Sequence, residues 1–305
     1  MGRQGDGVDV AVVGASFAGL TAALFLARGR RSVALFDTGE TRNRFAPASH
    51  GFLGQDGAAP DAIRLRGRAE VLAYPTATLR EARVTAVEGG PDGFRLTASD
   101  GSETGARRVI LAHGMRDVLP PVEGLDACWG VSAVQCPYCH GYELADRPTG
   151  VLMSSRKDAF HHLDLLRDWT GDLTLLLDGG PLAEEDRREL GRRAVRVEPE
   201  RVAALRHERG QIAALRLASG RELALGALYL APRTEPASPL PALLGLRMAA
   251  EDQGPHVAVD EAGRTSAPGV YAAGDLARDV FGAAAAAADG AAAGIACHRS
   301  LLGMD

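Results

Sequence analysis

Two cysteines that stand three positions apart are the residues best suited to redox chemistry. Cys136 and Cys139 enclose a proline and a tyrosine, and His140 follows directly. In an intracellular protein such a pair is expected to close reversibly into a disulfide, with the thiolate as its reactive form. The imidazole of His140 titrates near neutral pH, which makes it our candidate for the general acid and base of thiol exchange. The motif therefore predicts a dithiol/disulfide relay.

A zinc site, a glutaredoxin-type motif and a purely structural disulfide are the alternatives for this pair. Glutaredoxins are short chains that place the motif after their first strand. A zinc ion needs more ligands, and the adjacent His161 and His162 would point to different faces of one helix. A disulfide across so short a loop adds little stability. Cys128 and Cys297 show no paired spacing, so we interpret them as buried and unreactive.

A glycine-rich turn close to the start of the chain predicts a dinucleotide site. Residues 9–13 are apolar and β-branched, as in a buried parallel strand, and good helix formers follow at residues 20–28. The turn between them, residues 14–19, reads Gly-Ala-Ser-Phe-Ala-Gly. Ser16 thus replaces the middle glycine, and its hydroxyl can donate to phosphate. Asp37 ends the next expected strand, where a carboxylate accepts hydrogen bonds from ribose hydroxyls.

A second signature, near the other end, selects FAD as the dinucleotide. Residues 270–273 are expected to form a strand that leads into Gly274 and Asp275, and ligands of parallel sheets bind at such strand ends. The N-terminus of an alanine-rich helix, residues 283–296, points back toward the same crevice. Ala-His-Gly at residues 112–114 ends another expected strand, where flavoproteins of this kind usually have threonine in place of the histidine. The combination is typical of flavoproteins with two dinucleotide folds.

The order of these segments predicts one domain inserted into another. Residues 1–117 and 250–305 are expected to form a discontinuous FAD-binding domain, and residues 118–249 an inserted domain that carries the redox pair. Proline-rich stretches at residues 119–121 and 232–241 mark the two crossings between them. The expected fold class is therefore α/β.

The inserted domain lacks the turn that a nicotinamide cofactor needs. After the expected strand at residues 150–153 the chain reads Ser-Ser-Arg-Lys-Asp-Ala, with no glycine, and side chains there crowd the space of a pyrophosphate. Asp178, which follows the next expected strand, repels the 2′-phosphate of NADPH. The fold there is thus expected to be a degenerate NAD(P)H-type fold. Arg156 and Lys157 leave an unconventional phosphate grip open, in which case NADH is favoured over NADPH.

The chain resembles the low-molecular-weight thioredoxin reductase family over nearly its whole length. The shared motifs, in the family's order, are Gly-x-Ser-x-x-Gly, Ala-His-Gly, Cys-Pro-Tyr-Cys and Gly-Val-Tyr-Ala-Ala-Gly-Asp. The reductases have aspartate in place of His140. The run His-Gly-Tyr-Glu at residues 140–143 instead resembles the dithiol oxidase branch, whose members close disulfides in gliotoxin, holomycin and romidepsin. Residues 42–44 and 50–52 resemble this branch as well.

The resemblance implies two Rossmann-like domains, the second inserted in the first, and a homodimer. It implies that Cys139 faces the flavin, that Cys136 exchanges with substrate, and that His140 moves protons. The FAD contacts carried over from the family are Gly14, Ser16, Phe17, Ala18, Gly19, Asp37, Arg42, Asn43, His50, Val84, Ala112, His113, Gly114, Gly274, Asp275, Gly282 and Ala283.

These expectations favour an FAD-dependent dithiol oxidase. It would form an intramolecular disulfide in a small-molecule dithiol of secondary metabolism, with molecular oxygen as acceptor and hydrogen peroxide as product. The alternative is a disulfide reductase that uses NAD(P)H or ferredoxin and acts on a thioredoxin-like protein. A third, non-enzymatic interpretation is a flavin-bound redox sensor or interaction protein.

Composition excludes several other classes of function. The chain has 305 residues, of which 46% are hydrophobic, enough for more than one buried core. Its net charge of −5 argues against nucleic acid or an anionic membrane surface as a partner. No apolar run reaches the roughly 18 residues that span a bilayer. Four cysteines are too few for a secreted disulfide scaffold, so a cytoplasmic protein is expected.

Overall fold

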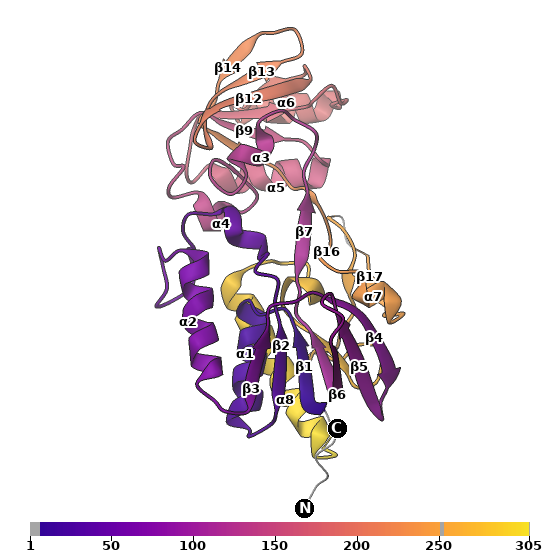
Figure 1. Ribbon diagram of the computed structural model, residues 1–305. Coiled ribbons are helices and arrows are strands. Elements are labelled where there is room, and N and C mark those ends of the chain that lie inside the picture. Colours follow the sequence, from indigo (N-terminus) through magenta and orange to yellow (C-terminus); the bar gives the residue numbers. More distant parts are fainter. Residues whose placement is uncertain (1–6, 251–252, 305) are drawn as a thin grey trace, which may run out of the picture.

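The computed structural model describes residues 7–250 and 253–304. The outer limits of the expected FAD-binding domain, residues 1 and 305, therefore lie outside the described residues. Figure 1 shows two lobes stacked along the long axis of the molecule, with strand β7 running between them. The architecture is α/β, with a Rossmann-type parallel sheet in each lobe, as expected. Within the described residues, no helix is both long and apolar enough to cross a membrane.

The first lobe is built on a seven-stranded sheet in the order β3-β2-β1-β6-β5-β4, with β19 paired to β6. The neighbouring strands β3, β2, β1 and β6 pair in parallel, and β19 also pairs in parallel with β6. Strand β5 pairs in antiparallel fashion with β6 on one side and with β4 on the other. Residues 10–13 of the β-branched run at the start of the chain are buried in the sheet, as their lack of polar side chains requires. The strands are β1 (Gly7–Val13), β2 (Val33–Phe36), β3 (Ala77–Arg80), β4 (Val84–Gly90), β5 (Gly93–Ala98), β6 (Glu103–Leu111) and β19 (Val270–Ala272).

The three longest helices of this lobe are α1 (Phe17–Arg28), α2 (Pro60–Leu72) and α8 (Ala283–Leu301). Helices α1 and α8 pack closely because small residues line their contact. A Cβ atom on Gly290 of α8 would lie only 2.1 Å from the carbonyl oxygen of Ala18 in α1, and one on Gly294 would lie 2.9 Å from that of Ala22. The alanine-rich sequence is thus explained by helix packing, with the two ends of the chain joined in one core.

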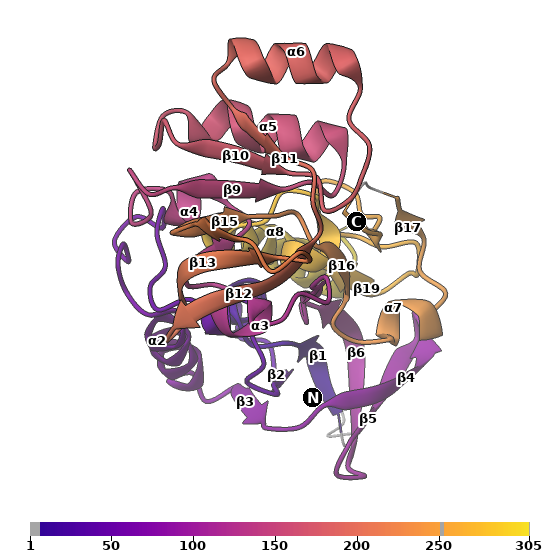
Figure 2. The same ribbon diagram turned by 90° about the horizontal axis from the view of Figure 1, so that it is seen from above.

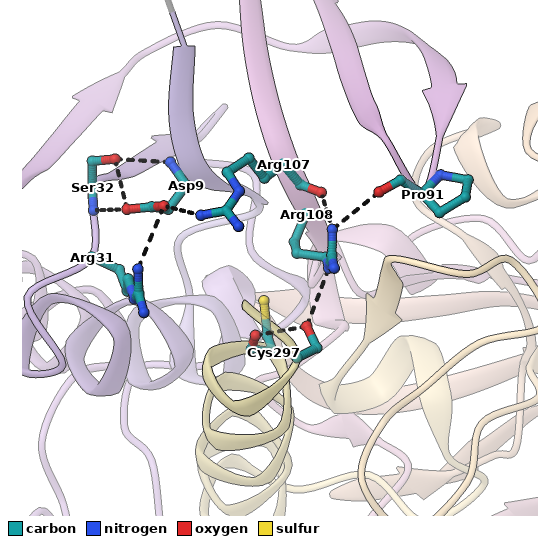
Figure 3. Close-up of polar contacts among 8 residues, drawn as sticks. Asp9, Arg31, Ser32, Pro91, Arg107, Arg108 and Cys297 are labelled. Atoms are coloured by element: carbon teal, nitrogen blue, oxygen red, sulfur yellow. Dashed lines mark hydrogen bonds and ion pairs between the residues drawn. The ribbon is translucent and has the colours of Figure 1, made fainter. Parts of the chain in front are cut away.

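Polar contacts tie the strands together at the end of the sheet where β1 begins (Figure 3). Asp9 accepts hydrogen bonds from the backbone amide of Ser32 at 3.0 Å and from the guanidinium of Arg107 at 3.1 Å. Arg108 donates to the hydroxyl of Ser300 in α8 at 3.1 Å. These bonds join β1, β6 and α8 to the segment just before β2, so they fix the frame from which the opposite strand ends project.

The second lobe has a five-stranded sheet in the order β11-β10-β9-β15-β8, in which every pairing is parallel. Figure 2 shows helices α5 and α6 on one side of this sheet and strands β12 and β13 on the other. Each side has its own apolar core. The elements are α3 (Leu125–Cys128), β8 (Ala133–Val134), α4 (Pro137–His140), β9 (Thr149–Leu152), α5 (Arg156–Leu166), β10 (Leu173–Leu176), α6 (Glu184–Arg192), β11 (Arg196–Glu198), β12 (Val202–Glu208), β13 (Gln211–Leu217), β14 (Glu222–Ala224) and β15 (Ala227–Tyr229).

Two strands carry the chain between the lobes. β7 (Met115–Val118) leads into the second lobe, β16 (Arg233–Pro236) leads out of it, and the two pair in antiparallel fashion. Within the proline-rich stretch at residues 232–241, four residues form strand β16, which ends at Pro236. The remaining elements are η1 (Arg42–Phe45), α7 (Leu240–Leu243), β17 (Met248–Ala249), β18 (His256–Val257) and η2 (Gly274–Ala277).

Candidate active site

The two cysteines of the motif are joined in a disulfide, with their Cα atoms 5.3 Å apart. Cys136 occupies the position just before the short helix α4, without a capping hydrogen bond. Pro137 occupies the first helical position, where the fixed backbone angle of proline favours a helix start. This single turn brings Cys139 back beside Cys136. Figure 1 shows α4 at the level where the two lobes meet. The local sequence thus builds the disulfide at the boundary between the two lobes.

A cavity of about 260 Å³ lies against this disulfide and has walls from both lobes. Cys136, Cys139 and His140 come from the second lobe. Residues of the first lobe complete the wall, among them Ser16, Phe17, Ala18, Arg42, Asn43, His50, Ala112, His113, Gly114, Gly274, Asp275, Gly282 and Ala283. The structure therefore brings the redox pair, the first glycine-rich turn and the start of α8 to one place.

A smaller neighbouring cavity, of about 80 Å³, extends this site toward the end of β2. Gly14, Asp37 and Val84 line it. Ser16 and His113 line both cavities, so the two spaces adjoin each other. Together they lead from the carboxylate of Asp37, past the N-terminus of α1, to the disulfide.

Of the predicted site residues, all except Gly19 line one of these two cavities. Gly19 lies inside α1, where a Cβ atom would stand 1.8 Å from the carbonyl oxygen of Gly14. Its small size thus permits the turn to close onto the helix, and the residue is absent from the cavity walls.

The residues present fit a bound dinucleotide. Gly14 has a φ of 102°, and a Cβ atom there would lie 2.3 Å from the carbonyl oxygen of Ala112, so only glycine allows this turn. Ser16 precedes α1 without capping any of its amides, which leaves first-turn donors for a phosphate beside the cavity. Asp37 receives one hydrogen bond from Arg64 at 2.9 Å and keeps its other carboxylate oxygen for a ribose hydroxyl.

His113 is a buried polar side chain that lacks a partner within the described residues. Both of its ring nitrogens are inaccessible to solvent and make no hydrogen bond. Burial lowers its pKa to about 4, so the ring is neutral at physiological pH. Because buried polar groups are normally paired, an unpaired ring at this place fits a position beside a bound ligand.

Arg42, which was predicted to contact the cofactor, is bound by other side chains of the protein. The prediction did not include these partners. Its guanidinium forms ion pairs with Asp117 at 2.6 Å and with Asp275 at 3.0 Å, and donates to Gln135 at 3.2 Å. It also stacks over the ring of Phe281, 3.9 Å from the ring centroid. Burial raises the pKa of Asp275, and the charge of Arg42 opposes that rise.

His140 is also unpartnered, and it lies next to the disulfide. Both of its ring nitrogens are buried without a hydrogen bond. Burial lowers its pKa below the ordinary value of 6.5, as does His50, while the carboxylate of Glu143 acts in the opposite direction. The ring is therefore a neutral base at physiological pH, which is the form that takes a proton from a thiol.

Several cavity residues were missed by reasoning from the sequence. Asp117, Gln135, Phe45 and Met115 line the larger cavity, yet none belongs to a recognisable motif. Met115 and Asp117 lie on β7, and pairing with β16 sets their position. The one signal in the sequence that could have indicated Met115 and Asp117 is that β7 comes shortly before the redox pair.

The turn in the second lobe is filled by the chain's own side chains. Ser155 caps α5 by accepting a hydrogen bond from the amide of Asp158 at 3.1 Å. Arg156 forms a two-pronged ion pair with Asp186, so it is engaged away from any phosphate. Asp178 accepts from the amide of Val202 at 2.8 Å and closes a loop of its own lobe.

The other two cysteines are buried and free. Burial raises the pKa of Cys128 to about 11 and that of Cys297, shown in Figure 3, to about 12. Both therefore stay protonated and unreactive, as interpreted from the sequence. Among the described residues, no group of three or more histidine, cysteine, aspartate or glutamate side chains is placed to hold a metal ion.

Comparison with known proteins identifies the family. Residues 8–152 match the pyridine nucleotide-disulphide oxidoreductase family. The chain is 31% identical to thioredoxin reductase sirT of Leptosphaeria maculans, over 97% of this chain and 95% of that protein. It superposes on the crystal structure of an oxidoreductase from Agrobacterium tumefaciens with a TM-score of 0.92 and 39% identity, over 98% of this chain and 100% of that one. The crystal structure of HlmI gives a TM-score of 0.90 and 38% identity, over 100% and 95% of the two chains.

These likenesses extend over both lobes and confirm the expected fold class. The family's members carry FAD, and the two adjoining cavities have the turn, carboxylate and helix start that this cofactor requires. The chain therefore belongs to the thioredoxin reductase-like branch of the pyridine nucleotide-disulphide oxidoreductases, as an FAD-binding disulfide oxidoreductase.

Proposed function

We propose that this disulfide oxidoreductase is a dithiol oxidase, which forms an intramolecular disulfide in a small-molecule dithiol of secondary metabolism and passes the electrons to molecular oxygen. The observation that carries the proposal is the contrast between the two nucleotide turns. In the first lobe the turn is glycine-rich and leaves the first amides of α1 without a side-chain cap. In the second lobe Ser155 caps the helix and Arg156 is paired with Asp186. Among the described residues, the second-lobe turn therefore offers a nicotinamide donor no helix start as open as that of α1.

The chain's own residues support thiol exchange at the cavity. A thiolate of the substrate attacks the Cys136–Cys139 disulfide, a mixed disulfide forms, and the second substrate thiolate displaces the cysteine. The substrate leaves as a disulfide, and two thiols remain on the protein. His140 is neutral and buried beside the pair, so it can accept a proton from an attacking thiol. We assign substrate exchange to Cys136 and electron transfer toward the cofactor to Cys139.

FAD, when bound, supplies the two-electron acceptor that returns the protein dithiol to a disulfide, and oxygen then takes the two electrons with two protons to give hydrogen peroxide. The residues that would hold it are those lining the two cavities. Gly14, Ser16 and the start of α1 would meet the pyrophosphate, and Asp37 the ribose. His113, with its two unpartnered nitrogens, would contact the cofactor at the end of β6.

The test mixes the flavin-loaded protein anaerobically with a simple dithiol and, separately, with NADPH or NADH. The visible absorbance of the flavin should disappear with the dithiol and remain with either nicotinamide. When air is admitted to the dithiol-reduced sample, the absorbance should return, and one hydrogen peroxide should form for each flavin reoxidised. Rapid loss of absorbance with NADH or NADPH would show that the direction of electron flow is wrong.

A disulfide reductase that acts on a thioredoxin-like protein is the second candidate, fed by NAD(P)H or ferredoxin. The observation in its favour is the exposure of two aromatic residues beside the redox pair, 72% for Tyr138 and 85% for Tyr142. Exposed tyrosines are common where proteins bind one another. In the same experiment this candidate predicts that reduced ferredoxin or a nicotinamide removes the flavin absorbance and that a thioredoxin-like disulfide restores it without air.

A further inference from the structure

The residue directly before the redox pair is bound by side chains of the first lobe. The side-chain oxygen of Gln135 accepts a hydrogen bond from the guanidinium of Arg42 at 3.2 Å, and its side-chain amide donates to the side-chain oxygen of Gln253 at 2.7 Å. A guanidinium can only donate, so Arg42 fixes which way the amide of Gln135 points. Arg42 lies in η1 and Gln253 between β17 and β18, and both segments pack on the first lobe.

The backbone of Gln135 is bound by the second lobe. His162 is buried in α5, and its Nδ1 lies 2.9 Å from the backbone carbonyl oxygen of Asp158, one turn earlier in that helix. Its Nε2 lies 2.7 Å from the backbone carbonyl oxygen of Gln135. The residue bonded to Cys136 is thus held through its side chain by one lobe and through its backbone by the other.

A close backbone contact sets the spacing of the two lobes beside this residue. Gly130 lies in the second lobe between α3 and β8 and has a φ of 78°. A Cβ atom on Gly130 would lie 2.9 Å from the carbonyl carbon of Phe45 in η1 and 2.8 Å from the Cβ of Phe45. Only glycine allows this approach. Segment η1 therefore meets the second lobe twice, by packing at Phe45 and by a hydrogen bond from Arg42.

Arg42 also connects these contacts to the cofactor cavity. It pairs with Asp275 at 3.0 Å, and Asp275, Gln135, Cys136 and Cys139 line the same cavity. A sulfur that passes electrons to a bound cofactor has to meet the reacting atom closely, and a displacement of about 1 Å can cost a large factor in rate. The contacts of Gln135 are placed to prevent such a displacement.

We propose that Gln135 is the positioning residue of the redox pair: its links to Arg42 and Gln253 hold the disulfide at the wall of the cofactor cavity, and Gly130 sets the spacing of the lobes. The inference rests on the proposed function. It concerns the step in which a new S–S bond forms between Cys136 and Cys139 while two electrons and the two thiol protons pass to FAD. Gln135 itself exchanges neither electrons nor protons.

The first test follows reduction of the flavin after rapid anaerobic mixing of flavin-loaded protein with increasing amounts of dithiothreitol. At low concentration the rate reports thiol exchange, and at saturation it reports electron transfer from the protein dithiol to the flavin. Gln253 lies outside the walls of both cofactor cavities. In Gln253→Leu the saturating rate should nevertheless fall by about fivefold, the factor that corresponds to one lost hydrogen bond, while the rate at low concentration stays unchanged.

Two further variants define the link between the glutamines. The saturating rate of Gln135→Leu should fall more than that of Gln253→Leu, and the double variant should be no slower than Gln135→Leu alone, because one contact is lost only once. Gln211→Leu is the matched control. It removes a hydrogen bond that Gln211 accepts from Arg147 within the second lobe, at 2.9 Å, and should behave as wild type.

The second test, small-angle X-ray scattering of the flavin-loaded protein, is independent of turnover. In Gly130→Ala the new methyl group has to displace Phe45, so the radius of gyration should be larger than in the wild type. Gly220→Ala is the matched control, because Gly220 has a comparable φ of 88° but nothing lies within 4 Å of its Cβ position. This variant should keep the wild-type radius.

An unchanged saturating rate in Gln253→Leu, or equal losses at low and saturating dithiothreitol, would overturn the positioning role of Gln135. Identical radii for the two alanine variants would overturn the role of Gly130. If dithiols do not reduce the wild-type flavin at all, the oxidase proposal itself fails, whereas scattering still shows whether the contact between Gly130 and η1 sets the spacing of the lobes.

Discussion

At the scale of single residues, Cys136 and Cys139 line the same cavity but are assigned different partners. Cys139→Ser should keep its FAD, because no cofactor-binding element changes, yet its flavin should not be reduced by dithiols. Anaerobic absorbance measurements check this result. Cys128→Ala, which removes a buried free thiol outside the cavity walls, is the control and should be reduced normally. Normal reduction of the Cys139→Ser flavin would refute the proposed order of the two sulfur atoms.

His113 predicts a pH dependence of stability. Its pKa is about 4 in the folded protein and 6.5 when exposed, so between these values the unfolded chain binds the proton and the folded protein does not. Stability is therefore complete above pH 6.5 and falls as the pH drops through this window, by about 3 kcal/mol in total.

Urea unfolding of His113→Thr across this range checks the prediction. The variant should lose that part of the pH dependence, whereas His161→Gln, at an exposed position, should retain it. A variant curve parallel to that of the wild type would mean that His113 is not the titrating group.

The residues that could be predicted from the sequence are those whose role depends on the local backbone. Gly14, Ser16 and Asp37 follow from a strand, a turn and a helix in one short segment, and all three line the cavities. The partners of Arg42 could not be predicted in this way. Asp117 and Asp275 lie far from it in the sequence, and only the folded arrangement of β7 and η2 brings them to it.

At the scale of elements, the contact between α1 and α8 depends on the absence of side chains. Gly290→Ala should destabilise the protein by about 1–3 kcal/mol, since its Cβ would overlap the carbonyl oxygen of Ala18. Gly191→Ala in α6 is the matched control, because nothing lies within 4 Å of its Cβ position. That change should instead stabilise the protein by about 0.5–1 kcal/mol. Urea unfolding measures both, and equal effects would show that helix packing does not explain Gly290.

Most elements could be predicted where residue pattern and burial agree. The expected strand at residues 150–153 corresponds to β9, shifted by one residue, because its apolar run is buried on both sides. Helix α8 extends to Leu301, beyond the expected end at residue 296, since its last residue is buried in the core and no glycine follows until Gly303. Strand β16 was not predicted, because its pairing with β7 leaves no signal in a proline-containing segment.

At the scale of the whole molecule, Arg42 joins η1 to β7, to η2 and to Gln135 of the second lobe. Arg42→Met should destabilise the protein by about 3 kcal/mol at neutral pH, because it leaves two partly buried carboxylates without a counter-charge. The loss should shrink in acid. Burial already raises the pKa of Asp275, and without Arg42 that pKa rises further, so protonation removes the unpaired charge.

Urea unfolding at several pH values tests this sign. The double variant Arg42→Met with Asp275→Asn should regain part of the loss at neutral pH. A loss that is the same at every pH would show that packing against Phe281 matters more than the ion pairs.

The domain limits at residues 117/118 and 249/250, and a homodimer, stay predictions.

The first lobe is assembled from both ends of the chain, and this has a consequence for biosynthesis. Elements β8 through β15 are continuous in sequence, so the second lobe can finish folding while translation is still under way. The sheet around β1 and β6 cannot, because β19 and α8 follow the whole second lobe in the sequence. Until then the small-residue face of α1 has no partner. Cofactor loading must therefore wait until α8 has been synthesised, when the lobe that carries the redox pair is already complete.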